Sequence, residues 1–257
     1  GFDALSDRLL AELKRRNIPL IEDVCESHGA THGGRKLGSF GLASDFSFYF
    51  AHHMSTIEGG MVCTDSDEFY EAVRMYRSHG MAREISDPER KRKIAEENPQ
   101  VSPDFTFLVP SCNFRGTEIG GVLGLSQLKR LDENNRRRTE NFHRFLKEID
   151  PERFRTEFRV DGSSNYAFPL VIRQKDFAFR DRLEKRMREY RIEFRRGNAG
   201  GGNQLRQPYL KGIVPPDEYR KYPEVEHIHD FGYYIGNYPT LPPERVSELC
   251  RILNEAR

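Results

Sequence analysis

Apolar and polar positions alternate along the first part of the chain in patterns that predict short helices and strands. In residues 2–16 the leucines recur at spacings of one, three and four, which predicts a helix. Apolar runs at residues 18–21, 43–50 and 60–64 predict strands, the first buried and parallel, the third antiparallel to the second. Residues 29–41 are rich in glycine and predict a loop.

The rest of the chain has mainly helical patterns and one clear strand. Residues 67–79 predict a helix, and the charged segment 87–100 has the pattern of an exposed helix or a loose loop. A long helical region follows at residues 117–149. The remaining predicted elements are a strand at residues 166–172, a helix at residues 176–190 and a final helix at residues 243–256.

This succession of elements predicts an α/β protein with two domains. Pro151 follows the long helical region and marks the expected start of the second domain. We therefore expect a large α/β domain at residues 1–150 and a smaller α+β domain at residues 151–257.

Charge and cysteine content narrow the range of partners and compartments. The 257 residues include 41 Lys and Arg against 40 Asp and Glu, which gives no reason to expect nucleic acid or an anionic membrane as a partner. No apolar run approaches the roughly 20 residues that span a bilayer, and the first residues lack the layout of a signal peptide. Four scattered cysteines without a CxxC pair indicate reduced thiols in a cytoplasmic protein.

Polar residues lie near the ends of the predicted strands, where α/β proteins bind ligands. Asp23 ends the first apolar run as an expected buried carboxylate, and Glu26 follows three residues later. Ser47 lies within the second run, and His52 follows the end of that run. Because strand ends in an α/β sheet line the ligand crevice, we expect these side chains to converge.

The segment that contains Ser47 and His52 has no lysine. Residues 46–60 read FSFYFAHHMSTIEGG, and the nearest lysines are Lys36 and Lys91. This absence becomes informative when the surrounding motifs are compared with those of a known family.

Residues 18–64 resemble the DegT-type sugar aminotransferases, pyridoxal phosphate enzymes that act on nucleotide-linked keto sugars. The family pattern is a strand end IEDxAxxxGA, then FSF, then a lysine, then a TxGEGG turn. This chain has IEDVCESHGA, FSF and STIEGG in the same order. The resemblance implies a fold-type I protein, with a mostly parallel sheet flanked by helices and a smaller C-terminal α+β domain.

The resemblance also implies which residues hold the cofactor. Asp23 would keep the pyridine nitrogen protonated, Glu26 would lie beside the ring hydroxyl, and Ser47 would bind the phosphate. Asn113 would reach across a homodimer to the phosphate of the neighbouring cofactor. The alternatives are a helix cap or ion pair for Asp23, an exposed acid for Glu26 and a backbone-bonded hydroxyl for Ser47.

His52 falls where the family carries its lysine, and this resembles the branch of nucleotide-sugar 3-dehydratases. A lysine would bind the cofactor covalently; an imidazole cannot, but its ordinary pKa of about 6.5 suits a general base. The resemblance implies a cycle that starts from pyridoxamine phosphate, formed with an amino acid donor expected to be glutamate. A nucleotide-linked 4-keto-6-deoxyhexose would then lose its 3-hydroxyl, and ammonia would be released.

Residues that contact the substrate are expected in both domains. Arg115 could hold the carboxylate of the amino donor, because a guanidinium binds carboxylates in a bidentate manner; an ordinary surface ion pair is the alternative. The loop IEFRRGNAGGGNQLRQPYL resembles the substrate-side loop of the family. The expected contacts with sugar or diphosphate are Arg195, Asn203, Gln207 and either His227 or His229.

Other readings of the chain stay open. It could be an aminotransferase with a natural or engineered lysine-to-histidine change, or a non-catalytic binding or regulatory relative. Family members carry a long further stretch before the segment where this chain begins, so we expect a fragment, a degenerate protein or a chain completed by another polypeptide. The resemblance predicts no iron–sulfur cluster and no other metal, because Cys25 alone matches a cluster position and residues 81–86, MAREIS, contain no cysteine.

Overall fold

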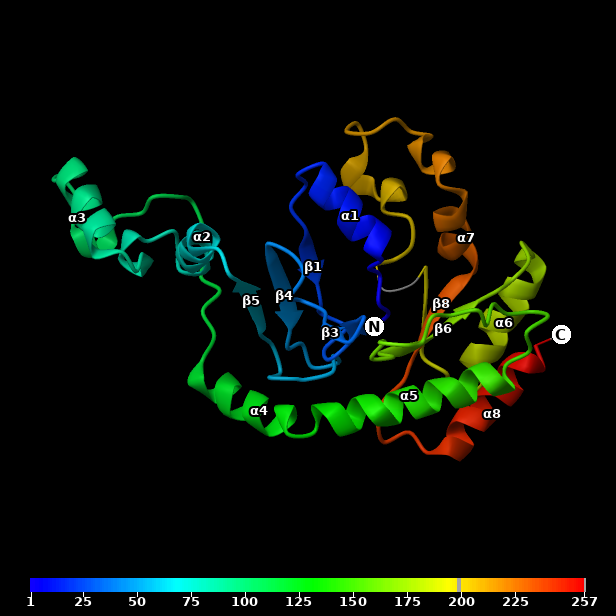
Figure 1. Cartoon of the computed structure of the whole chain (residues 1–257). Helices are drawn as coiled ribbons and strands as arrows, with labels where there is room; N and C mark the ends of the chain where they lie inside the picture. The colour runs from blue at the N-terminus through cyan, green and yellow to red at the C-terminus, as the bar shows by residue number, and fades with distance from the viewer. Residues whose placement is uncertain (198–199, 257) are drawn as a thin grey trace. The chain divides into compact units, whose positions relative to one another are not determined.

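The structure is a computed structural model that describes residues 1–197 and 200–256 (Figure 1). The chain divides into two compact units, one of residues 3–131 and one that combines residues 1–2 with residues 132–257. The sequence placed this division at residue 151. The observed division lies earlier because helix α5 (Leu131–Glu148) contributes Phe142 and Phe145 to the core of the second unit.

The first unit, residues 3–131, is built from short strands and helices. Its strands are β1 (Ile21–Asp23), β2 (Thr31–His32), β3 (Arg35–Lys36), β4 (Ala43–Ser47) and β5 (Gly60–Thr64). Its helices are α1 (Asp7–Arg15), α2 (Asp67–Arg77), α3 (Pro88–Glu97) and α4 (Glu118–Leu128), with 3-10 turns η1 (Ala82–Glu84) and η2 (Pro103–Phe105). The charged segment left open between helix and loop is therefore helical, and the Asp87 side chain caps it by accepting from the Glu89 N–H.

A three-stranded mixed sheet carries the strand-end residues of this unit. β1 pairs with β4 in parallel, with Asp23 opposite Asp45, and β4 pairs with β5 in the expected antiparallel manner. The segment expected to be a loop at residues 29–41 also contains the antiparallel hairpin of β2 and β3. Its turn uses Gly33 and Gly34 at φ values of 57° and 83°, which glycine adopts without a steric penalty.

The second unit combines an antiparallel sheet with helices. Its strands are β6 (Ala167–Val171), β7 (Phe194–Arg196) and β8 (Gly232–Gly236), in the order β6-β8-β7. Besides α5, its helices are α6 (Phe177–Glu189), α7 (Pro223–Phe231) and α8 (Pro243–Asn254), with 3-10 turns η3 (Gln204–Arg206), η4 (Pro208–Leu210) and η5 (Glu218–Lys221). The sequence predicted neither β7, β8 nor α7.

The core of the second unit is aromatic and aliphatic. Phe145 of α5 stacks on Phe168 of β6 with 4.8 Å between ring centroids, and Leu183 and Leu253 are fully buried beside them. In the first unit the buried cluster around Met75 is much smaller. Among the helices of the described residues, none combines the length and apolarity that crossing a membrane requires.

Candidate active site

Asp23 lies at the carboxyl end of β1 with an exposed side chain, so the expectation of a buried carboxylate was wrong. The buried acid is its neighbour Glu22, because successive strand residues face opposite sides of the sheet. The Glu22 carboxylate accepts backbone N–H bonds from Gly38, Phe40 and Gly41 at 2.6 to 2.8 Å. Glu22 therefore holds the loop beside β1, and Asp23 is left facing solvent.

Cys25 links the Asp23 carboxylate to a second one. Its backbone N–H donates to Asp23 Oδ1 at 3.0 Å, and its thiol donates to Asp45 Oδ2 at 3.2 Å. Burial and the two nearby carboxylates raise the pKa of the Cys25 thiol far above its usual range. Cys25 is therefore a protonated hydrogen-bond donor in this site.

His52 is mostly buried and faces two acids. Its Nε2 lies 3.6 Å from Glu26 Oε1, and 14% of its side chain is exposed. Burial lowers the pKa of His52, and the charges of Glu26 and Asp23 act in the opposite direction. Burial has the largest effect, so the imidazole is neutral at neutral pH and can accept a proton.

Short-range backbone bonds define the turn that carries His52. The His52 N–H donates to the Tyr49 carbonyl at 3.0 Å, and the Thr56 N–H donates to the Phe48 carbonyl at 2.9 Å. The rings of Tyr49 and His52 meet edge to face with centroids 5.3 Å apart. These contacts place the imidazole a few residues beyond the end of β4.

Ser47 ends β4, opposite Gly60 of β5. Its hydroxyl oxygen accepts from the Tyr49 N–H at 3.2 Å, which is the local backbone bond that the sequence left open as an alternative. A hydroxyl also carries a donor hydrogen, so this bond leaves Ser47 able to donate to an anionic oxygen.

Asn113 and Arg115 are exposed and contact each other. Asn113 Oδ1 accepts from the Arg115 backbone N–H at 3.1 Å and from its Nε at 3.0 Å. The structure thus brings the expected dimer-contact residue and the expected carboxylate-binding residue to one exposed turn before α4.

Two residues expected near the substrate in the second unit are buried and bonded within it. Asn203 accepts from the Leu205 N–H at 3.1 Å and donates to Glu226 Oε1 at 2.8 Å. His227 Nε2 lies 2.7 Å from the Ile172 carbonyl oxygen in the interior. These bonds favour structural roles for Asn203 and His227.

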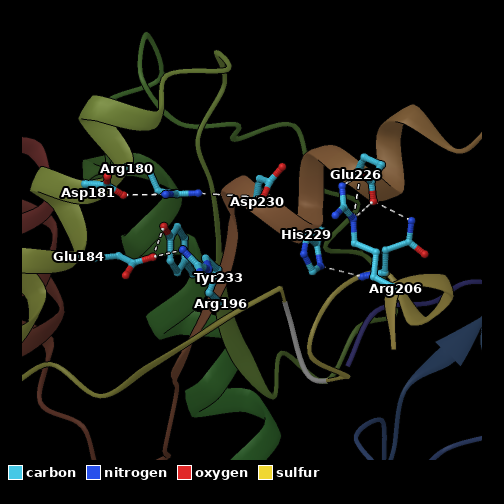
Figure 2. A network of polar contacts seen from close by, with 10 residues as sticks. Arg180, Asp181, Glu184, Arg196, Arg206, Glu226, His229, Asp230 and Tyr233 are labelled. Atoms are coloured by element: carbon cyan, nitrogen blue, oxygen red, sulfur yellow. Dashed lines mark hydrogen bonds and ion pairs between the residues drawn. The ribbon is translucent and has the colours of Figure 1, made fainter. Parts of the chain in front are cut away.

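The other expected residues of the second unit are more accessible. Arg195 is exposed, with its guanidinium 5.6 Å from the Tyr234 ring centroid, and Gln207 is half-buried. Figure 2 shows the neighbouring loop, where Arg206 forms an ion pair with Glu226 of α7. His229, one helical turn beyond Glu226, accepts from the Asn203 N–H at 3.1 Å.

The sequence pattern of the DegT/DnrJ/EryC1/StrS aminotransferase family matches residues 6–254. The chain belongs to this family. The match covers both units, so the resemblance seen in residues 18–64 is confirmed and extends along nearly the whole chain.

Curated relatives of this family member include dehydratases and aminotransferases. The chain is 29% identical over 226 residues to GDP-4-keto-6-deoxy-D-mannose 3-dehydratase of Escherichia coli O55:H7. The aligned residues cover 87% of this chain and 57% of that relative. Lipopolysaccharide biosynthesis protein RfbH of Salmonella typhimurium is 30% identical, covering 92% of this chain and 57% of that protein. GDP-perosamine synthase of Caulobacter vibrioides is 35% identical over 50% of this chain and 30% of that enzyme.

Solved structures of the family have the same fold. Escherichia coli GDP-4-keto-6-deoxy-D-mannose-3-dehydratase with bound hydrated PLP superposes with a TM-score of 0.80 and 27% identity, covering 96% of this chain and 63% of that chain. The same kind of enzyme with a trapped PLP–glutamate geminal diamine gives a TM-score of 0.77 at 26% identity, covering 96% and 64%. The expected α/β fold of fold-type I is therefore confirmed, and the chain spans less than two thirds of these relatives.

Two buried histidines, His28 and His53, lie beside the candidate site, and their sequence positions carried no catalytic signal. In the structure the His28 ring packs on Phe46 and Phe48, the neighbours of Ser47, and stacks on the ring of His53, which follows His52.

Proposed function

We propose that the protein is a 3-dehydratase that uses pyridoxal and pyridoxamine phosphate and acts on a nucleotide-linked 4-keto-6-deoxyhexose, with glutamate as amino donor. The observation that carries this proposal is the neutral His52 imidazole at the family's lysine position, close to Glu26 and Asp23. The similarity to GDP-4-keto-6-deoxy-D-mannose 3-dehydratases over most of the chain supports it.

The described residues fit this cofactor in charge and donor type. The exposed Asp23 carboxylate is available to a ring N–H, and the Ser47 hydroxyl retains a hydrogen for a phosphate oxygen. When bound, the cofactor supplies an electron sink for a carbanion next to its reactive carbon. Glu26 would lie beside the ring hydroxyl, and Arg115 and Arg195, both exposed, would meet anionic groups of donor and sugar nucleotide.

In this proposal His52 moves the proton. Its neutral imidazole takes the proton whose removal allows the sugar's 3-hydroxyl to leave. The Glu26 carboxylate, 3.6 Å from Nε2, stabilises the imidazolium that forms. The products are a 3-deoxy-4-keto sugar, ammonia and the keto acid of the donor.

Aminotransfer is the second candidate, because GDP-perosamine synthase is 35% identical over half of this chain. An aminotransferase would accumulate a stable 4-amino sugar without ammonia. The absence of a lysine from residues 46–60 disfavours it.

Substitution of His52 tests the proposal. With pyridoxal phosphate, glutamate and a GDP-linked 4-keto-6-deoxyhexose, the wild-type protein should release ammonia and a 3-deoxy sugar. His52→Lys should lower this release by about 10²-fold or more, since a lysine there would bind the cofactor covalently and replace the imidazole base. Ammonia is measured by coupled assay and the sugar by mass spectrometry.

The control is His143→Lys, the same change at an exposed histidine of α5, which should leave dehydration intact. An absorbance change of bound pyridoxal phosphate from an aldehyde-like to an amine-like band on adding glutamate would report the first half-reaction separately. A stable amino sugar from the wild-type protein would favour aminotransfer. No turnover and no cofactor binding would favour a non-catalytic role.

A homodimer with a shared site is part of the proposal. Its basis is the exposed position of Asn113, which the family resemblance assigns to the neighbour's cofactor phosphate. Analytical ultracentrifugation should give a dimer in the presence of cofactor. A monomer that binds the cofactor fully would contradict the shared site. The cytoplasmic location expected from the sequence stays a prediction.

A further inference from the structure

His28 is a buried histidine that the proposed reaction does not use. It lies in the segment between β1 and β2, five residues after Asp23, and only 3% of it is exposed. Burying a polar imidazole costs free energy unless its surroundings compensate, so its contacts indicate its role.

The His28 ring contacts the segment that carries Ser47. Its ring packs edge to face on Phe46 of β4 and on Phe48, with centroids 5.6 and 5.9 Å apart. It also forms a hydrogen bond with the backbone of Ser47. His28 therefore fixes the end of β4 against the segment that follows Asp23.

His28 also stacks on the residue next to His52. The rings of His28 and His53 lie 5.7 Å apart with 22° between their planes, and His53 is 4% exposed. A buried side chain in such a stack has little freedom, so the backbone at residue 53 is held in place. Because His52 precedes it directly, the position of the His52 ring depends on this stack.

We propose that His28 is a positioning residue that acts through His53 to hold His52 at the proposed base position. This inference deepens the proposed function and rests on it for its catalytic meaning. Burial, with the charge of His52 as a lesser cause, lowers the pKa of His28 to about 4. The His28 ring is therefore uncharged at neutral pH and does not compete with His52 for the proton.

The test is the titration of His52 in the cofactor-free protein, followed by NMR of the imidazole Cε1–H and assigned with His52→Asn. Within the first unit, the titratable groups that face His52 include Glu26, Asp23, His28 and Tyr49. In the wild-type protein His52 should titrate below an ordinary histidine, because it is buried. His28→Ala should raise this pKa toward about 6.5, since losing the stack exposes the ring.

His28→Phe is the rescue variant, because it keeps a flat buried ring against His53 and should keep the low His52 pKa. If His28→Ala does not fold, His28→Gln removes the ring, keeps an amide donor toward Ser47 and should give the same rise. The resonance of His32, bound to Asp3 at 2.8 Å, should not move in any variant. His28→Ala or His28→Gln with an unchanged His52 titration would overturn the proposal, as would a rise in His28→Phe equal to theirs.

In the loaded enzyme, His28→Ala should lower kcat on the order of tenfold with KM little changed, because a displaced base slows the chemical step and not binding. The NMR result does not depend on turnover. An altered His52 titration in a protein that shows no dehydration would therefore reject the proposed function and retain the positioning role. Normal dehydration together with an unchanged His52 titration in His28→Ala would retain the proposed function and reject the positioning role.

Discussion

The Cys25 thiol lies between two carboxylates, and this environment determines its reactivity. Asp23 accepts from its backbone and Asp45 accepts from its Sγ. A thiol reacts as the thiolate, whose formation beside two negative charges is unfavourable. Although Cys25 is half-buried, it should behave as an inert thiol.

We expect Cys25 to react with an alkylating reagent more slowly than exposed Cys112, by roughly tenfold for each unit by which its pKa is raised. Asp45→Asn removes one of the charges and should speed labelling of Cys25 but not of Cys112. Peptide mass spectrometry after timed labelling measures both sites. Equal rates at Cys25 and Cys112 in the wild-type protein would show that the carboxylates do not control this thiol.

At the same scale, the structure contradicts the exposure that the sequence predicted for one candidate site residue, Asp23. The sequence selected Asp23, Ser47 and His52 from strand ends, and the structure brings Asp23 and His52 into one electrostatic environment. It assigned burial to Asp23 because the apolar run ends there. A three-residue strand alternates sides, and the amides that hold Glu22 come from residues 38–41, which the strand pattern does not include.

At the scale of elements, helices with clear caps or periodicity were predicted and very short strands were not. Ser66 and Asp176 cap α2 and α6 as N-terminal side-chain acceptors, which agrees with the predicted starts. The hairpin strands β2 and β3 have two residues each, too few to give a period of two.

The same reasoning explains β7 and β8 in the second unit. β7 reads FRR and β8 reads GYYIG, and neither alternates apolar and polar residues. β7 and β8 pair with each other although about 35 residues separate them in the chain. Tyr233 of β8 is also fully buried, and its hydroxyl donates to Glu184 of α6 at 3.0 Å, as Figure 2 shows. Contacts between segments so far apart in the chain have no signature in a local pattern.

At the scale of the whole molecule, the two units have unequal cores. The second unit buries a continuous cluster that includes Phe142, Phe168 and Tyr233. The small cluster of the first unit contains Met75, Ala82 and Ile85. Burial of apolar area is the main stabilising contribution to folding, so the second unit should open less often.

Hydrogen exchange measures this difference. Backbone amides of β6 and β8 should exchange more slowly than those of β1 and β4, by about tenfold for each roughly 1.4 kcal/mol of difference in local stability. Exchange followed by mass spectrometry of peptides from each unit, in the cofactor-free protein, provides the comparison. Equal protection in both sheets would indicate that core size does not control local stability here.

His52 and His53 are adjacent in the chain but lie in different environments, so the length of the segment before them matters. His53 stacks on His28, and His52 faces Glu26. The order of the two histidines in the chain therefore determines which one is held in the stack and which one is the proposed base. Inserting one codon between β4 and this pair would move His52 to the place of His53 and leave no imidazole facing Glu26, even though every side chain was retained. Point substitutions along the exposed part of this turn should accumulate freely during evolution, while its length stays constant.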